Sequence, residues 1–221
     1  MAFFKVLGII PASGLLAVGT FFYATRQIEA IEPSPEDPIF NGEYHRKYNP
    51  NNNPTVNDLH IRKIPISQID PAYLENPERL IERFSGGVWA GSAFAVQRSL
   101  GSDRQPPQLW GPTELLESNY QPGTIITDEL LVLRKSNDAI LIRGGDKVSK
   151  AELRPMDGLI ELSARLKPEE GHVEFGFKSL FFQGLGKSSR IPMPGFVVWL
   201  HEQYAKALLE SGVRHVLRDS R

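Results

Sequence analysis

The chain has 221 residues, with 25 Lys or Arg, 26 Asp or Glu, five His and no Cys. This length fits one domain of ordinary size with a single hydrophobic core. A net charge of −1 argues against a nucleic-acid binder with a broad basic surface, and the lack of Cys excludes disulfide scaffolds, thiolate metal sites and Cys nucleophiles.

The first informative segment is an uncharged apolar run from Val6 to Ala24. As a helix it would be roughly 28 Å long, close to the thickness of a bilayer core. Aromatic residues stand at both ends, where a membrane interface favours them. We therefore predict a single-pass anchor in an endomembrane. Its orientation stays open, because Lys5 and Arg26 lie on opposite sides of the run.

Two alternatives to an anchor remain for this segment. One is a cleaved signal peptide, with a small-residue site at Ala17-Val18-Gly19, although the apolar run continues through Tyr23. The other is a buried helix of a soluble protein.

Residues 27–57 are rich in proline and include the sequence NPNNNP. Because proline fixes φ and removes an amide donor, we predict an extended connector with turns. Phe40, Tyr44 and Tyr48 are exceptions that we expect to pack onto the domain. The predicted organisation is an anchor (1–26), a tether (27–57) and one domain (58–221).

The domain is expected to begin with a strand and a helix. Residues 59–62 alternate apolar and polar side chains, as in a half-buried strand. A helix begins after Asn76, a favourable N-cap followed by Pro77, and runs to about Val96. Gly86-Gly87 is expected to loosen or break this helix. A polar loop then covers 101–123.

Two hairpins are expected after this loop. Alternating apolar residues predict four antiparallel strands with one apolar face, at 125–134, 139–143, 159–166 and 172–182.

The last element is a helix from Pro194 to about Leu217, whose inward face includes His201, Tyr204 and Leu208. The predicted class is α+β, with a curved antiparallel sheet gripping this long C-terminal helix and a single transmembrane helix in front. Because a helix and a concave sheet cannot pack everywhere, we expect a cavity between them.

This order of elements resembles the START/SRPBCC helix-grip superfamily over residues 59–217. The sequences TDELLVLRKSNDAILIRGGD and VVWLHEQYAKALLESGVRHVL are similar to small domains placed near that superfamily. The whole chain, anchor included, also resembles short fungal proteins found beside secondary-metabolite genes. The resemblance implies a cavity for an apolar small molecule, or a cofactor-free isomerase or cyclase.

Motifs for several other chemistries are incomplete. Gly186-Lys187-Ser188 imitates the end of a phosphate-binding loop, but Phe181 stands where that pattern needs Gly. His201-Glu202 begins like a zinc-protease helix, but Ala205 replaces the second His ligand. Neither a Gly-x-Ser-x-Gly elbow nor a dinucleotide fingerprint occurs. We expect no cofactor and no metal.

The remaining candidates are polar residues on apolar faces. His201 can donate or accept a proton, and the Tyr204 hydroxyl can hydrogen-bond a developing enolate. Asp128 lies in phase with the apolar residues of its expected strand, so it needs a partner there. We predict two groups, catalytic His201, Tyr204 and Asp128, and ligand-binding Trp89, Arg143, Leu208, Phe175 and Phe177. In the alternative interpretation these residues fill the core, satisfy backbone groups or, for Asp128, face water.

Three functions are compatible with these features. The first is a cofactor-independent isomerase or cyclase, including pericyclic ring closure, that acts on an apolar intermediate of secondary-metabolite biosynthesis. It would work beside membrane-bound biosynthetic enzymes and would not bind nucleic acid. The second is a non-catalytic lipid- or metabolite-binding module tethered to a membrane. The third is an adaptor that docks partner enzymes.

Overall fold

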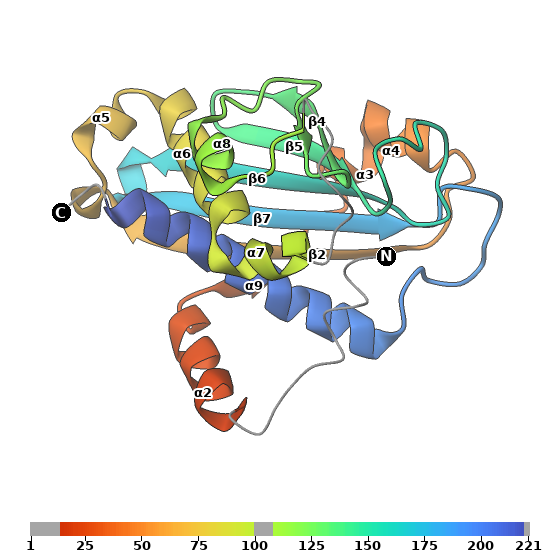
Figure 1. The fold of residues 1–221 in the computed structure, drawn as a ribbon, viewed down its shortest axis with the longest axis horizontal. Helices are drawn as coiled ribbons and strands as arrows, with labels where there is room; N and C mark the ends of the chain where they lie inside the picture. The colour runs from red at the N-terminus through yellow and green to blue at the C-terminus, as the bar shows by residue number, and fades with distance from the viewer. Residues whose placement is uncertain (1–13, 100–107, 219–221) are drawn as a thin grey trace.

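The computed structural model describes residues 14–99 and 108–218. Within these ranges, seven antiparallel strands form one curved sheet in the order β1-β2-β7-β6-β5-β4-β3 (Figure 1). The strands are β1 (Glu29–Ile31), β2 (Thr55–Pro65), β3 (Ile125–Ile126), β4 (Leu130–Lys135), β5 (Ala139–Gly144), β6 (Asp157–Lys167) and β7 (His172–Phe182). The two predicted hairpins, β4–β5 and β6–β7, are confirmed.

The α+β class and the long C-terminal helix are confirmed as well. The helices are α2 (Gly14–Thr25), α3 (Pro38–Asn41), α4 (Glu43–Tyr48), α5 (Pro71–Leu74), α6 (Pro77–Ala90), α7 (Ser92–Ser99), α8 (Pro112–Glu117) and α9 (Gly195–Arg218). Two short 3-10 helices, Ile66–Gln68 and Pro168–Glu170, adjoin the ends of β2 and β6.

Hydrophobic side chains pack on both faces of the sheet. The larger core joins α6 and α9 to one face, through residues such as Phe84, Leu209 and Phe175. The smaller core joins α3 and α4 to the other face, through residues such as Tyr48 and Leu180. Because side chains alternate along a strand, β5, β6 and β7 each contribute to both cores. The sheet is therefore covered on both faces, which differs from the expectation of one apolar face.

The predicted tether is only partly extended. Its residues 29–31 form β1, which pairs with β2, and residues 38–48 form α3 and α4. Asp37 is the N-cap of α3, and its side chain accepts a hydrogen bond from Ile39 N at 2.9 Å. Pro38 follows in the first helical turn, where proline is favourable. The predicted packing of Phe40, Tyr44 and Tyr48 onto the domain is confirmed.

The helix predicted after Asn76 is confirmed, but its break is not at Gly86-Gly87. The Asn76 side chain accepts a hydrogen bond from Arg79 N at 3.2 Å, and α6 continues through both glycines to Ala90. A Cβ on Gly87 would overlap the Cβ of His215 on α9. The glycine therefore permits the close crossing of α6 and α9, and this packing outweighs its low helix propensity. The loop expected at 101–123 contains α8; its residues 101–107 lie outside the described ranges.

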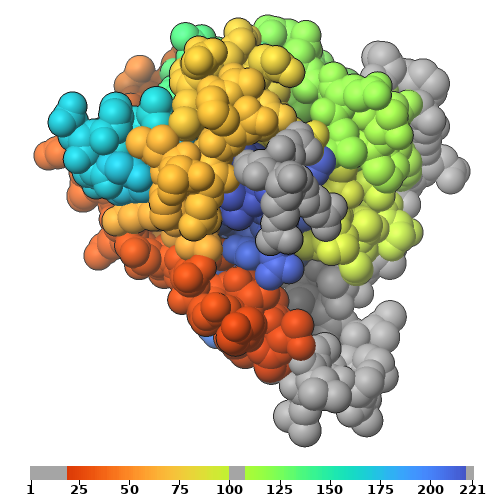
Figure 2. All heavy atoms as spheres, turned by 90° about the vertical axis from the view of Figure 1, so that its left-hand side faces the viewer, coloured from red at the N-terminus to blue at the C-terminus, as the bar shows by residue number. Residues whose placement is uncertain are grey.

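The predicted anchor, Val6–Ala24, lies partly outside the described residues, since its first eight positions precede Gly14. In the described ranges, 14–99 and 108–218, no helix is long and apolar enough to cross a membrane. Helix α2 packs beside α9 (Figure 2), and the side chains of Phe22 and Tyr23 on it are exposed.

Candidate functional site

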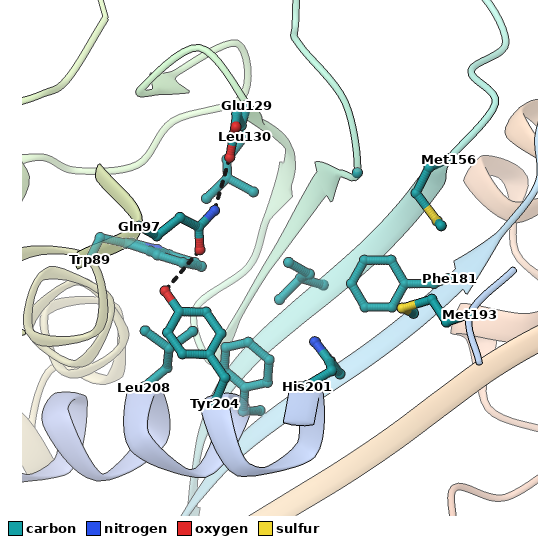
Figure 3. A pocket seen from close by; sticks show the side chains of 13 residues that line it. Trp89, Gln97, Glu129, Leu130, Met156, Phe181, Met193, His201, Tyr204 and Leu208 are labelled. Atoms are coloured by element: carbon teal, nitrogen blue, oxygen red, sulfur yellow. Dashed lines mark hydrogen bonds between the residues drawn. The ribbon is translucent and has the colours of Figure 1, made fainter. Parts of the chain in front are cut away.

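A cavity of about 90 Å³ lies between the concave face of the sheet and the helices α6, α7 and α9 (Figure 3). It is partly open to solvent. Its wall is mostly apolar and aromatic, and comprises Trp89, Gln97, Glu129, Leu130, Gly145, Met156, Ile160, Phe177, Phe181, Met193, His201, Tyr204 and Leu208. An engineered cavity of about 150 Å³ accepts benzene. This cavity is smaller but open on one side, so it suits a very small molecule, a single ring that protrudes at the opening, or one end of a larger molecule.

The spacing of residues in α9 and β7 explains how they reach the cavity. His201, Tyr204 and Leu208 lie three and four residues apart on α9, so they share one face of the helix. Phe177 and Phe181 lie four residues apart on β7, so they project from the same face of the sheet. The cavity is thus formed where the α9 face and the β7 face do not meet fully.

A hydrogen-bonded chain of polar side chains forms one wall of the cavity (Figure 3). The Tyr204 hydroxyl donates to Gln97 Oε1 at 2.8 Å, and Gln97 Nε2 donates to Glu129 Oε2 at 2.9 Å. Burial, and next the negative charge of Glu129, raise the pKa of Tyr204. Tyr204 therefore stays protonated at neutral pH and acts as a hydrogen-bond donor.

His201 belongs to a buried polar cluster that also contains Asp58, His60 and Ser179. His60 Nε2 lies 3.0 Å from Asp58 Oδ2, and the Ser179 hydroxyl donates to Asp58 Oδ1. His201 Nε2 lies 2.9 Å from Ser179 Oγ and 3.5 Å from Asp58 Oδ2. Burial acts to raise the pKa of Asp58, but hydrogen bonds from His201, His60 and Ser179 and the charge of His201 hold it well below its usual range.

This cluster is not arranged like a catalytic triad, although it contains Ser, His and Asp. In a triad, the two ring nitrogens of His separate the Ser from the Asp. Here Ser179 gives its proton to Asp58 directly, so its oxygen accepts the proton of His201 Nε2. Ser179 is therefore not activated as a nucleophile. Instead, Asp58 and Ser179 fix the tautomer and orientation of His201 at the cavity wall.

The structure brings together five of the residues predicted for the site. Trp89, Phe177, His201, Tyr204 and Leu208 all line the cavity. They come from α6, β7 and α9, which are far apart in the sequence and meet only in the folded domain.

The prediction that Asp128 lies on the apolar face of a strand is wrong. Thr127 adopts a left-handed conformation, with φ of 55°, and the chain turns between β3 and β4. Asp128 lies in this turn, where its carboxylate pairs with Lys147 at 3.1 Å. The turn instead directs the next residue, Glu129, to the cavity.

Arg143 and Phe175 are buried, but neither lines the cavity. Arg143 shares its face of β5 with Leu141, opposite the face of Ile140 and Ile142, because strand residues alternate. Its guanidinium binds both carboxylate oxygens of Asp157, at 2.9 and 2.7 Å. Phe175 packs against Phe84 of α6, with ring centroids 5.1 Å apart, and fills the larger core.

Four residues near the cavity were not singled out from the sequence. These are Gln97 of α7, Asp58 and His60 of β2, and Ser179 of β7. Asp58 and His60 are two positions apart and share a face with Ile64, so strand alternation contains a signal for a buried polar pair. Their convergence with Ser179 and His201 depends on pairing between segments more than 100 residues apart.

Comparison with known proteins identifies no relative: no family model, no curated protein and no solved structure matches this chain. Across the described parts of the chain, no three His, Asp or Glu side chains are grouped in a way that could hold a metal ion. The candidate site therefore rests on its geometry.

Proposed function

We propose that the cavity beneath α9 binds a small, largely apolar molecule, or the apolar end of a larger one. The observation that carries this proposal is the partly open cavity itself, with aromatic walls and a few polar groups at defined positions. Ligand sites usually combine an apolar lining with a small number of placed polar side chains. In this proposal the domain is a binding module of the helix-grip type.

The helix-grip assignment is supported by the topology. One curved antiparallel sheet is followed directly by a long helix, α9, which lies on its concave face (Figure 1). The intervening helices follow β2, and the remaining strands come in sequence order along the sheet. We further propose that residues 6–24 hold the domain at a membrane.

Binding can be tested with benzene as a probe of the cavity. Met156 and Met193 line it, and the chain contains only three methionines, so ¹³C-methyl methionine spectra of the full chain provide a simple readout. We expect benzene to shift the Met156 and Met193 signals in a saturable manner.

A variant pair makes this binding test specific. Leu208→Phe fills the cavity and should abolish the shifts, whereas Leu133→Phe on the opposite face of the sheet should leave them unchanged. Unsaturable shifts, or equal shifts in both variants, would contradict the proposal.

A second candidate function is isomerisation or cyclisation of the bound molecule. It is favoured by His201, a titratable side chain on the cavity wall that Asp58 and Ser179 hold in a fixed orientation. An oriented His can transfer a proton between two positions of a bound molecule without a cofactor. The Tyr204 hydroxyl, on the same wall, donates its hydrogen to Gln97 and can accept one from the bound molecule.

Catalysis can be separated from binding by metabolite profiling in the native host. Isomerisation and cyclisation by proton transfer conserve mass, so His201→Gln should accumulate a compound isobaric with the product that disappears. The Leu133→Phe strain provides the control. If His201→Gln leaves the profile of isobaric compounds unchanged while Leu208→Phe alters metabolite levels, the chain binds without catalysing.

A further inference from the structure

The side chain of Trp89, which lines the cavity, carries a buried indole N–H group. Trp89 is 1% exposed and lies on the cavity wall beside Gln97 (Figure 3). Within the described residues, its Nε1 atom has no hydrogen-bond partner. Buried polar atoms are nearly always paired, and an indole nitrogen can only donate. This N–H group therefore favours an acceptor atom brought by a bound molecule.

We infer that the molecule bound beneath α9 is a neutral carbonyl compound whose oxygen accepts a hydrogen bond from Trp89 Nε1. This inference rests on the proposed binding site and specifies its ligand class. The other polar side chains of the lining compete little for the carbonyl. Tyr204, Gln97 and Glu129 are bonded to one another, and His201 Nε2 is engaged by Ser179 and Asp58.

Charge on the cavity wall distinguishes a neutral ligand from an acid. Glu129 is the carboxylate in the lining, and the lining contains neither Lys nor Arg. A carboxylate ligand would be desolvated next to Glu129, and the imidazole of His201, the remaining basic side chain of the lining, is already held by Ser179 and Asp58. Burying a charge without compensation in this way is costly. An amine would be attracted by the negative charge of Glu129. Its protonated nitrogen can only donate hydrogen bonds, however, so it would leave the Trp89 N–H group without an acceptor. A neutral carbonyl satisfies Trp89 without adding a charge.

Four cyclopentane derivatives of similar size test this inference directly. The probes are cyclopentanone, cyclopentane, cyclopentanecarboxylate and cyclopentylamine, each titrated into the full chain. The Met156 and Met193 methyl signals report occupancy, while the ¹⁵N–¹H signal of the Trp89 indole reports a hydrogen bond. The chain has three Trp, so Trp110 and Trp199 serve as internal references.

We expect all probes that enter to shift the methyl signals, but only cyclopentanone to move the Trp89 N–H signal strongly downfield. Trp89→Phe should reduce the preference for cyclopentanone over cyclopentane about tenfold, the value of one hydrogen bond of ordinary strength. Trp199→Phe, at an exposed position of α9, should preserve that preference. If Trp89→Phe does not fold, the N–H signal of Trp89 in the wild-type protein still tests whether cyclopentanone accepts this hydrogen bond.

The outcomes separate this inference from the proposed function. If cyclopentane and cyclopentanone bind equally and the Trp89 signal does not move downfield, the cavity binds apolar molecules but the carbonyl inference is wrong. Tightest binding of the carboxylate or of the amine would also overturn it. If none of the probes shifts the methyl signals, both the binding site and the inference fail.

Discussion

The Asp58 carboxylate should be a major determinant of stability, because it holds His60, Ser179 and His201 together beneath α9. Replacing it in Asp58→Asn removes the charge but keeps the shape of the side chain. Asp58 is 8% exposed and accepts bonds from both β7 and α9, so the variant leaves buried donors poorly paired. Breaking a buried pair in this way costs about 3 kcal/mol of unfolding free energy.

The loss should be measurable by thermal and urea unfolding of the full chain. For a domain of this size, about 3 kcal/mol corresponds to a decrease in Tm of roughly 6–12 °C. Asp138→Asn provides a control, because the Asp138 side chain is 48% exposed and lies 3.6 Å from Arg165. An exposed pair of this kind contributes less than about 1 kcal/mol.

The pH dependence gives a second, independent test. Since the folded pKa of Asp58 is lowered, its stabilising effect is complete above the unfolded pKa of about 3.9 and is lost as the pH falls below it. The difference in unfolding free energy between wild type and Asp58→Asn should therefore decrease by up to about 1.4 kcal/mol per pH unit below pH 4. A difference that is small at pH 7, or that stays constant down to pH 3, would refute the assigned role of this cluster.

Three further substitutions test the fold around the site. Gly87→Ala should destabilise the domain by about 1–3 kcal/mol in urea unfolding, because the added Cβ would overlap α9. Gly195→Ala is the control and should have little effect, because the space around Gly195 is open. Equal effects of the two substitutions would contradict the close crossing of α6 and α9. Arg143→Met should lower the free energy of unfolding by about 3–5 kcal/mol, because it leaves the buried carboxylate of Asp157 without its cationic partner. Benzene should still shift the methyl signals of Met156 and Met193 in the folded variant. A loss of benzene binding by the folded variant would assign Arg143 to the site. Asn76→Ala should lower stability by about 1 kcal/mol through loss of a helix cap, and an unchanged urea midpoint would exclude that role.

Local sequence patterns predicted most of the regular structure. Apolar residues alternate with polar or small ones over 160–166 in β6 and over 173–177 in β7, and α9 repeats apolar residues at helical spacing. These elements were therefore predictable without tertiary information. The N-cap at Asn76 was predictable for the same reason, because a cap depends on adjacent residues. Where packing between elements overrides local preference, as at Gly87, the prediction was wrong.

The candidate site was only partly predictable. His201, Tyr204 and Leu208 were predicted to face inward because helical geometry fixes which residues share a face. Asp128 was misplaced because a single residue in a left-handed conformation, Thr127, interrupts the strand, and threonine gives no strong signal for that conformation.

The sequence by itself determined the fold class, the hairpins and the inward face of the last helix, since all of these depend on contacts between near neighbours. Only the tertiary structure decided that Asp58 and Ser179 hold His201, that Arg143 lies on the opposite face, and that Trp89 has an unpartnered N–H at the cavity. These properties depend on where helices and strands distant in sequence meet. The register of β2 against β7 and the crossing of α6 and α9 determine which of these side chains come into contact, and no local sequence pattern predicts either of them.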